Sequence, residues 1–399
     1  MLLVAVTCLS QFYRVSNSVI APELTRELGL TARQLGWAGS AFFAALLALQ
    51  LPVGMWFDRY GARRTVAILS LFAMAGAVLL ARATSAESMI AARALVGLGC
   101  AASFMSVVFL CSRWFPSDRL TTVLSWVFAA SNIGTLGAAT PLAWATEAVG
   151  WRNSFLAVGA ITALVALLFF LLVRDAPPDA LPRPAHSERM GDVLRGLIEV
   201  LRMPGLLPVL AMHTFAYASM LTVLGIWAGP YLHDVHGLDG VARGNVILAM
   251  GAAQIAGILG YGPLDRLVNS RKKVVLSGAV LATLALLALG ALAQPPQALA
   301  VALLVAFTFF AGYPVVIVAQ GRALFPDRLA GRGVTTVNMA QLVGLVLLPS
   351  GSGLIIGAFD GGGTGVPEIA YRMVFLALAA CLMLGMAVYL KSRDSRPLG

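Results

Sequence analysis

An all-α polytopic membrane protein, with twelve transmembrane helices arranged as two six-helix bundles, is the fold that this sequence predicts. Three observations lead to it. Charge is too scarce for a water-facing surface, twelve apolar runs are long enough to cross a membrane, and five landmarks recur in order 207 to 220 residues apart. Because both copies have the same orientation, the repeat predicts two bundles related by a parallel pseudo-two-fold axis.

The composition excludes an ordinary soluble domain. Of the 399 residues 59% are hydrophobic and only 12% are charged, and the mean hydropathy is +0.86. Soluble domains carry about 25% charged residues, so a chain of this length must use lipid as part of its solvent. The four cysteines lie in or beside apolar runs without the spacing of metal ligands, and we interpret them as small hydrophobic residues. We expect no cofactor and no metal site.

Twelve apolar runs reach the roughly 20 residues that a hydrocarbon core of about 30 Å requires. They do not alternate with period two, so they predict helices and not the strands of a barrel. The first starts at Met1 without a basic segment before it, which argues against a cleaved signal peptide. The runs cover residues 2–22, 35–57, 65–82, 88–111, 120–145, 153–173, 206–231, 244–264, 274–293, 297–321, 334–357 and 370–390.

The basic residues predict the orientation. With the N-terminus in the cytoplasm, 20 of the 28 Lys and Arg residues fall on cytoplasmic segments and six on outer segments, while Arg14 and Arg93 lie inside runs. This asymmetry predicts a multi-pass protein of the inner (cytoplasmic) membrane with both termini cytoplasmic. It also explains the net charge of +10 without a nucleic-acid partner.

A long polar stretch rich in proline divides the chain. We predict an N-terminal six-helix bundle over residues 1–174, a cytoplasmic linker over 175–204 and a C-terminal bundle over 205–399. Residues 190–201 of the linker have the pattern of a short amphipathic helix. The landmarks that recur are Asp58-Arg59 as Asp265-Arg266, Pro22 as Pro230 at the ends of runs one and seven, Phe115-Pro116 as Phe325-Pro326, Trp151-Arg152 as Tyr371-Arg372, and Arg174-Asp175 as Arg393-Asp394.

The loop between the second and third runs carries closely spaced glycines and charges. Its pattern Gly54-x-x-x-Asp58-Arg59-x-Gly61-x-Arg63-Arg64 closely resembles the signature loop of the major facilitator superfamily, which lies between the same two helices. The resemblance implies a secondary transporter in which this loop holds the inward gate shut, with Asp58 near the positive start of helix eleven. Asp265 and Arg266 form a degenerate second copy. The alternative is that these charges only anchor the topology.

Arg93 lies in a second pattern of the same superfamily. Arg93-x-x-x-Gly97-x-Gly99 resembles its helix-four motif, which implies a part in proton coupling. A charge inside a membrane helix is costly and marks function by default; the alternative is an arginine that extends to the outer surface. The segment from Asn132 to Pro141 departs from the antiporter signature of helix five, which weighs against a drug/proton antiporter.

Arg14 is the strongest candidate for contact with a substrate. It lies in the middle of the first run, where Ser10, Arg14 and Asn17 share a helix face. Its guanidinium matches a carboxylate or phosphate, and none of the 18 acidic residues lies mid-run to neutralise it. Its spacing to Pro22 resembles the first helix of organophosphate:phosphate antiporters and of anion:cation symporters. The alternative is that backbone carbonyls and polar neighbours satisfy it permanently.

Polar residues of other runs complete the predicted site. Helix seven offers His213 and Tyr217 where the organophosphate antiporters use a second basic residue, which favours a carboxylate over a phosphate ester. His213 and Arg93 are the candidates for proton coupling, since histidine titrates near neutrality. The predicted substrate-binding residues are Arg14, Asn17, Tyr13, Asn132, His213, Tyr217, Gln254, Asn338 and Gln341.

The predicted function is transport of a small organic anion of the carboxylate type, by alternating access and coupled to protons. We expect a monomer whose partners are this small molecule, protons and membrane lipid. Efflux of amphipathic compounds or drugs by proton antiport is the alternative, and a non-transporting receptor or sensor on the same fold is an alternative of another class. No catalytic constellation indicates an enzyme. The residues do not distinguish symport, antiport and uniport.

Overall fold

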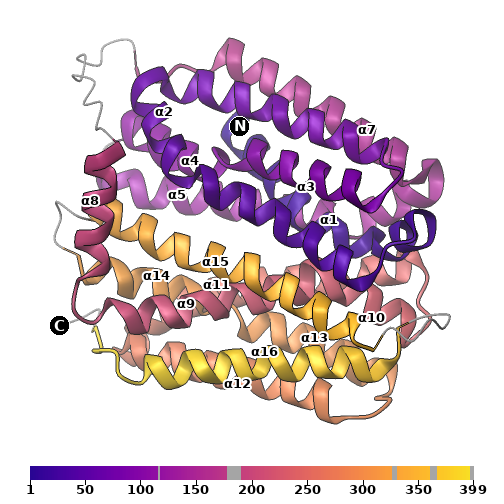
Figure 1. Ribbon diagram of the computed structural model, residues 1–399. Helices are drawn as coiled ribbons and strands as arrows, with labels where there is room; N and C mark the ends of the chain where they lie inside the picture. The colour runs from indigo at the N-terminus through magenta and orange to yellow at the C-terminus, as the bar shows by residue number, and fades with distance from the viewer. Residues whose placement is uncertain (116, 178–189, 326–329, 360–365, 396–399) are drawn as a thin grey trace.

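The computed structural model describes residues 1–115, 117–177, 190–325, 330–359 and 366–395, and every regular element within them is a helix (Figure 1). The first group comprises α1 (Leu2–Leu28), α2 (Ala32–Ala81), α3 (Ala86–Cys100), α4 (Ser103–Trp114), α5 (Ser117–Ser131), α6 (Ile133–Gly137) and α7 (Thr140–Leu172). After α8 (Met190–Leu201), the second comprises α9 (Leu206–Thr222), the π-helix η1 (Val223–Trp227), α10 (Ala228–Asp234), α11 (Gly240–Val268), α12 (Arg271–Ala291), α13 (Gln297–Phe310), α14 (Pro314–Ala323), α15 (Ala330–Gly357) and α16 (Glu368–Tyr389).

The helices account for the twelve predicted runs. Within the described ranges, nine helices are long and apolar enough to cross a membrane. Two of these spans, Ala32–Ala81 and Trp126–Leu172, carry two runs each, and within them the backbone breaks at Gly61 (φ 77°) and at Gly150 (φ 82°). The more polar α1 has 27 residues, which exceeds the roughly 20 that a span requires. The predicted amphipathic helix of the linker is confirmed as α8.

Two helices begin or end elsewhere than the apolar runs indicate. The sequence predicts that Pro22 ends the first run, but α1 continues through it to Leu28. A proline removes only one backbone hydrogen bond, so a well-packed helix can contain it. Likewise α11 begins at Gly240, which places Arg243 on a helix and not in a loop. Both differences extend polar helical turns beyond the apolar segment.

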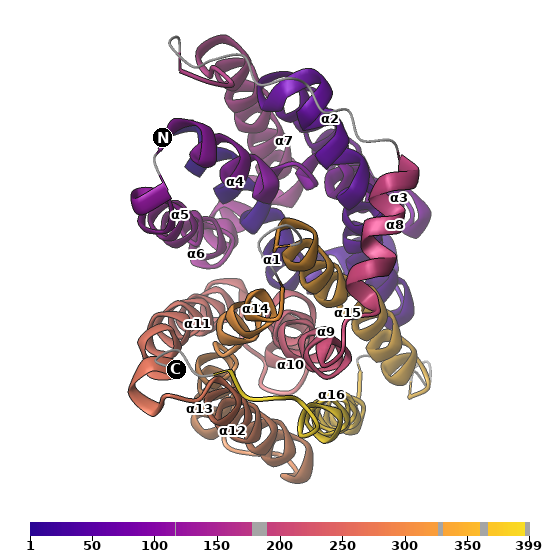
Figure 2. The ribbon, with the colours of Figure 1, turned by 90° about the vertical axis from the view of Figure 1, so that its left-hand side faces the viewer.

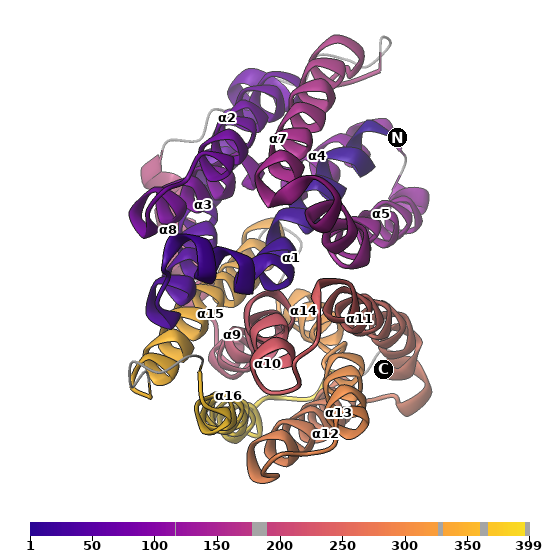
Figure 3. The same cartoon turned by 90° about the vertical axis from the view of Figure 1, so that its right-hand side faces the viewer.

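The helices form two bundles (Figures 2 and 3). Where the bundles meet, α15 packs against α2, and α1 packs against η1 and α10. The helix α8 crosses one end of the molecule, and α10 lies at the opposite end (Figure 1). We name these the α8 end and the α10 end. The basic residues predict that the α8 end is cytoplasmic. The division at residues 174/175 and 204/205 stays a prediction.

The same hydrogen bond begins the third and ninth predicted spans. The Asp175 carboxylate accepts from the backbone N–H of Arg63 at 2.8 Å, and the Asp394 carboxylate accepts from the backbone N–H of Lys272 at 3.0 Å. A carboxylate at a helix start satisfies an unpaired N–H and faces the positive end of the helix dipole. Each aspartate belongs to a recurring landmark, so the repeat extends to individual atoms.

A second pair of equivalent bonds lies beside the first. The Trp114 indole N–H donates to the Arg174 carbonyl, and the Gln320 amide donates to the Arg393 carbonyl, both at 3.0 Å. The donors differ in chemistry, but each acceptor is the main-chain oxygen directly before the capping aspartate. These pairs agree with a correspondence of spans 3/9, 4/10 and 6/12.

A left-handed residue lies before each capped helix. Gly61 has φ 77°, and Asn269, 208 residues later, has φ 48°. Glycine adopts this conformation without penalty, and asparagine is among the few other residues that tolerate it. The second copy of the loop has therefore kept the backbone shape while losing the glycine.

Candidate functional site

Direct contacts between the bundles close the α10 end. The Ser40 hydroxyl of α2 donates to the Val346 carbonyl of α15 at 2.7 Å and accepts from Ser350 at 2.7 Å. On the neighbouring helices, the Gly229 N–H donates to the Ser18 hydroxyl at 3.0 Å. A Cβ on Gly229 would lie 1.7 Å from the Ser18 carbonyl oxygen, so only glycine permits this approach.

A buried ion pair reinforces the closure. The Arg243 guanidinium of α11 donates to the Glu23 carboxylate of α1 at 2.5 Å, and the two side chains are 3% and 23% exposed. The same nitrogen reaches the Val19 carbonyl at 3.4 Å. Each bundle supplies one charge, so opening this end would separate a cation from its carboxylate in a partly desolvated place.

A cavity of about 230 Å³ lies between the bundles, on the α8 side of these contacts. It is lined from α1, α2, α3, α4, α5, α9 and α15. We call it the Arg14 cavity. Its polar lining residues are Thr7, Ser10, Gln11, Arg14, Gln50, Ser103, Ser131, Asn132, Tyr217, Asn338 and Gln341.

Arg14 is the one charged residue among the described residues that line this cavity. Its Nε is buried without a hydrogen-bond partner, and within the described chain its guanidinium has no ion pair. The ring of Phe43 lies 6.0 Å away and offers only a long cation–π contact. The alternative, that neighbouring groups satisfy Arg14 permanently, therefore has no support among the described residues. The cation faces a polar cavity whose described lining contains no carboxylate.

Tyr13 and Arg93 do not line the cavity, because both side chains point to the interior of the first bundle. The Tyr13 hydroxyl is bonded to Thr162 of α7 at 2.9 Å, and Arg93 donates to the Tyr13 carbonyl at 2.7 Å. Arg93 is 1% exposed, and its charge lies 4.9 Å from the centre of the Phe42 ring. It therefore does not extend to the surface; it holds the backbone of the residue directly before Arg14.

Asn17 lies on the Arg14 face of α1, but at the closed end. It is 1% exposed, and both its amide oxygen and its amide nitrogen lack partners. Unpaired buried polar groups are costly, so this part of the interface is poorly suited to permanent closure.

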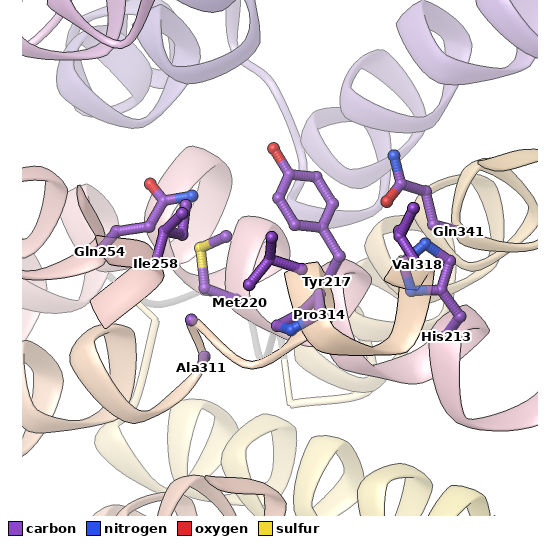
Figure 4. A pocket seen from close by; sticks show the side chains of 11 residues that line it. His213, Tyr217, Met220, Gln254, Ile258, Ala311, Pro314, Val318 and Gln341 are labelled. Carbon is purple, nitrogen blue, oxygen red and sulfur yellow. The ribbon is translucent and has the colours of Figure 1, made fainter. Parts of the chain in front are cut away.

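A smaller cavity of about 160 Å³ adjoins the first within the second bundle. His213, Tyr217, Gln254 and Gln341 are its polar lining residues, and Tyr217 and Gln341 line both cavities (Figure 4). His213 is fully buried, and neither of its ring nitrogens has a hydrogen-bond partner. The neighbouring Gln341 amide donates instead to Asn338 at 3.0 Å. We call this the His213 cavity.

Comparison with known proteins identifies the family. The model of the Major Facilitator Superfamily matches residues 2–270. The chain belongs to this superfamily. It is accordingly a multi-pass membrane protein that acts as a secondary transporter and not as an enzyme, and the predicted fold and family are confirmed.

Several curated relatives are named as transporters of organic acids. The chain is 24% identical to the D-galactonate transporter of Escherichia coli O6:H1, over 90% of this chain and 87% of that protein. It is 28% identical to a probable sulfoacetate transporter of Cupriavidus necator, over 60% of this chain but only 58% of that protein. A putative tartrate transporter of Agrobacterium vitis is 25% identical, over 88% of this chain and 82% of that protein.

Solved transporters share the fold. A bacterial homologue of the human lysosomal transporter Spinster superposes with a TM-score of 0.79 at 19% identity, covering 97% of this chain and 95% of that one. A D-xylose–proton symporter gives 0.75 at 14% identity, covering 98% and 95%. At these identities the likeness concerns architecture alone.

The signature loop of the superfamily lies at the α8 end. Asp58 and Arg64 are exposed, Gly54 packs near Met105, and the Arg59 charge lies 5.2 Å from the centre of the Tyr60 ring. Arg63 lies 4.8 Å from the centre of the Phe170 ring. The side chains of Asp265 and Arg266 lie outside the described part of the structure. The gating role of both copies stays a prediction.

Sequence reasoning missed several contributors to the site. Cys100, Phe104 and Phe128 line the Arg14 cavity, although their residue types suggest only packing. Arg243 and Glu23 meet across 220 residues, and each lies at the end of an apolar run, where a charge suggests a solvated loop. Charge complementarity between the outer ends of the first and eighth runs was the available signal.

Proposed function

We propose that this transporter moves a small organic carboxylate across the cytoplasmic membrane by alternating access. The observation that carries the proposal is Arg14, a cation that has no counter-ion among the described residues, in a polar cavity between the two bundles. Guanidinium binds carboxylate through two parallel hydrogen bonds. The relatives named for galactonate, sulfoacetate and tartrate support the same class of substrate.

Alternating access gains support from the polar groups that the closed end leaves unpaired. The amide oxygen and nitrogen of Asn17 lie buried without partners next to Ser18, whose hydroxyl is bonded across the interface. In a state open at the α10 end, water would reach these groups and the substrate would pass them on its way to Arg14. The described state would then be the one that faces the cytoplasm, with both termini on that side as the basic residues predict.

Proton coupling is part of the proposal, and His213 is its carrier. Arg93 is engaged with the Tyr13 carbonyl, whereas the His213 imidazole has both nitrogens unpartnered beside the Arg14 cavity. An imidazole can take up and release a proton at an unpartnered ring nitrogen. The protein is proposed to work as a monomer in membrane lipid.

The test measures the binding of D-galactonate to the purified protein in detergent through the rise in melting temperature that the ligand causes. Arg14→Gln is expected to abolish the ligand-induced rise, because a ligand stabilises only the fold that binds it. Arg14→Lys keeps the positive charge but loses the two parallel N–H donors of the guanidinium, and it should weaken binding by roughly ten- to a hundredfold. The empty protein should melt no lower than the wild type, since no internal bond of Arg14 is lost.

Arg33→Gln is the matched control, because it removes an exposed positive charge outside the cavity. It should leave the response to D-galactonate unchanged. The proposal fails if Arg14→Gln binds organic acids as the wild type does, or if a neutral or cationic compound proves to be the ligand with no dependence on Arg14.

A further inference from the structure

The two adjoining cavities differ in the charge that they offer. The Arg14 cavity has one cation, and among its described lining residues it has no second one. The described lining of the His213 cavity has no Lys, Arg, Asp or Glu. Together the cavities, of about 230 and 160 Å³, are near the lower end of the roughly 300–1,000 Å³ of small-molecule sites.

The polar groups of the His213 cavity are neutral and incompletely bonded. His213 has two unpartnered ring nitrogens at full burial, and it lies beside Gln341 while Gln254 lies at the other end of the cavity (Figure 4). A neutral imidazole offers one donor and one acceptor, and an amide offers both. Hydroxyl groups, which also donate and accept, complement this set.

We propose that the substrate is a hydroxylated monocarboxylate, with its acid group at Arg14 and its hydroxyl-bearing remainder in the His213 cavity. This inference rests on the proposed binding of a carboxylate by Arg14. Tyr217 and Gln341 line both cavities, so one molecule can span them. His213, Gln254 and Gln341 then determine specificity, and Arg14 supplies the charge recognition.

A dicarboxylate of the same length fits less well. Its second carboxylate would enter the His213 cavity, where it would be buried without a counter-charge, and an unpaired buried charge is strongly disfavoured. An unsubstituted fatty acid would form no hydrogen bond with the ring nitrogens of His213, so it would gain less on binding than a hydroxylated acid. The names of the relatives do not decide the question, because they include galactonate with one acid group and galactarate, glucarate and tartrate with two.

Calorimetric binding of three six-carbon acids to the full-length protein tests the proposal. The acids are D-galactonate, galactarate and hexanoate, measured at pH 8, where histidine with an ordinary pKa near 6.5 is neutral. At this pH a protonated His213 cannot supply a second cation to the diacid. D-galactonate should therefore bind roughly ten- to a hundredfold more tightly than either of the other two acids.

Variants of the His213 cavity separate this inference from the proposed function. His213→Leu and Gln254→Leu should reduce the affinity for D-galactonate to that for hexanoate and leave the affinity for hexanoate unchanged. Met220→Leu is the control, because Met220 lines the same cavity without a strong hydrogen-bonding group, and it should change neither affinity by more than about twofold. A fluorescence melting curve of each variant confirms the fold.

The outcomes distinguish two failures. If galactarate binds as tightly as D-galactonate, or if His213→Leu weakens all three acids equally, the monocarboxylate inference is overturned while Arg14 can still bind acids. If none of the acids binds, or if binding survives in Arg14→Gln, the proposed function fails and the inference fails with it.

Discussion

The interior of each bundle and the interface between the bundles use polar groups in opposite ways. Inside the bundles the hydrogen bonds come in equivalent pairs, as at Asp175 and Asp394. At the interface the bonds are single, as at Ser40 and Gly229, and the Asn17 amide is left without a partner. Repeated bonds indicate parts that stay intact, whereas single bonds across an interface suit a surface that closes only in part of the transport cycle.

The charges sharpen this contrast. The ion pair of the α10 end draws Glu23 from one bundle and Arg243 from the other, so it exists only while that end is closed. Among the described residues Arg14 has no carboxylate partner. In the proposed function the first bundle therefore supplies the cation for the substrate, and the second supplies neutral hydrogen-bonding groups.

The largest expected effect comes from filling the closest approach. Gly229→Ala would place a Cβ 1.7 Å from the Ser18 carbonyl oxygen, and overpacking of this kind costs about 1–3 kcal/mol. Closure of the α10 end should become roughly ten- to a hundredfold less favourable, with a similar loss of D-galactonate uptake into proteoliposomes. The control Gly351→Ala meets no atom within 4 Å. Equal uptake by both variants would contradict a closing interface at Gly229.

A smaller effect is expected from the ion pair. Glu23→Gln leaves Arg243 buried without a carboxylate and should shift molecules toward the state open at the α10 end, as seen in distances between spin labels. Adding Arg243→Gln should restore part of the closed population, with a coupling energy of about 1–3 kcal/mol. Strictly additive effects of the two changes would show that the pair does not hold this end closed.

The smallest effects should come from the interior. Asp175→Ala and Asp394→Ala each remove the carboxylate at a helix start, which costs about 0.5–2 kcal/mol. Both should lower the melting temperature by similar amounts and leave the affinity for D-galactonate unchanged. The corresponding asparagine variants, which keep an acceptor, should lose less. A loss confined to one aspartate would break the equivalence of the bundles.

Much of the fold could be predicted because its signals are local. Apolar runs give the spans, and the pattern of residues 190–201 gives α8 with its observed bounds. The breaks at Gly61 and Gly150 lie between predicted runs. By contrast, the continuation of α1 past Pro22 depends on tertiary packing, which a local rule for proline does not contain.

The sequence predicted which face of α1 points into the cavity, but not how far along the helix the cavity extends. Ser10 and Arg14 share a face of α1 and both line the cavity. Tyr13 does not, because one residue along a helix turns the side chain by about 100°, here toward Thr162. Asn17 shares the face of Arg14 but is covered, since which end is closed depends on the conformation and not on periodicity.

The paired bonds to Arg174 and Arg393 bear on how the two bundles diverged. An indole donates in one and an amide in the other, yet both acceptors are main-chain oxygens. If the chain arose by gene duplication, the donors could be exchanged freely while the acceptors could not be lost, because every amino acid brings the same carbonyl. Common ancestry would then persist in the backbone bonding after most side-chain identity between the copies had disappeared.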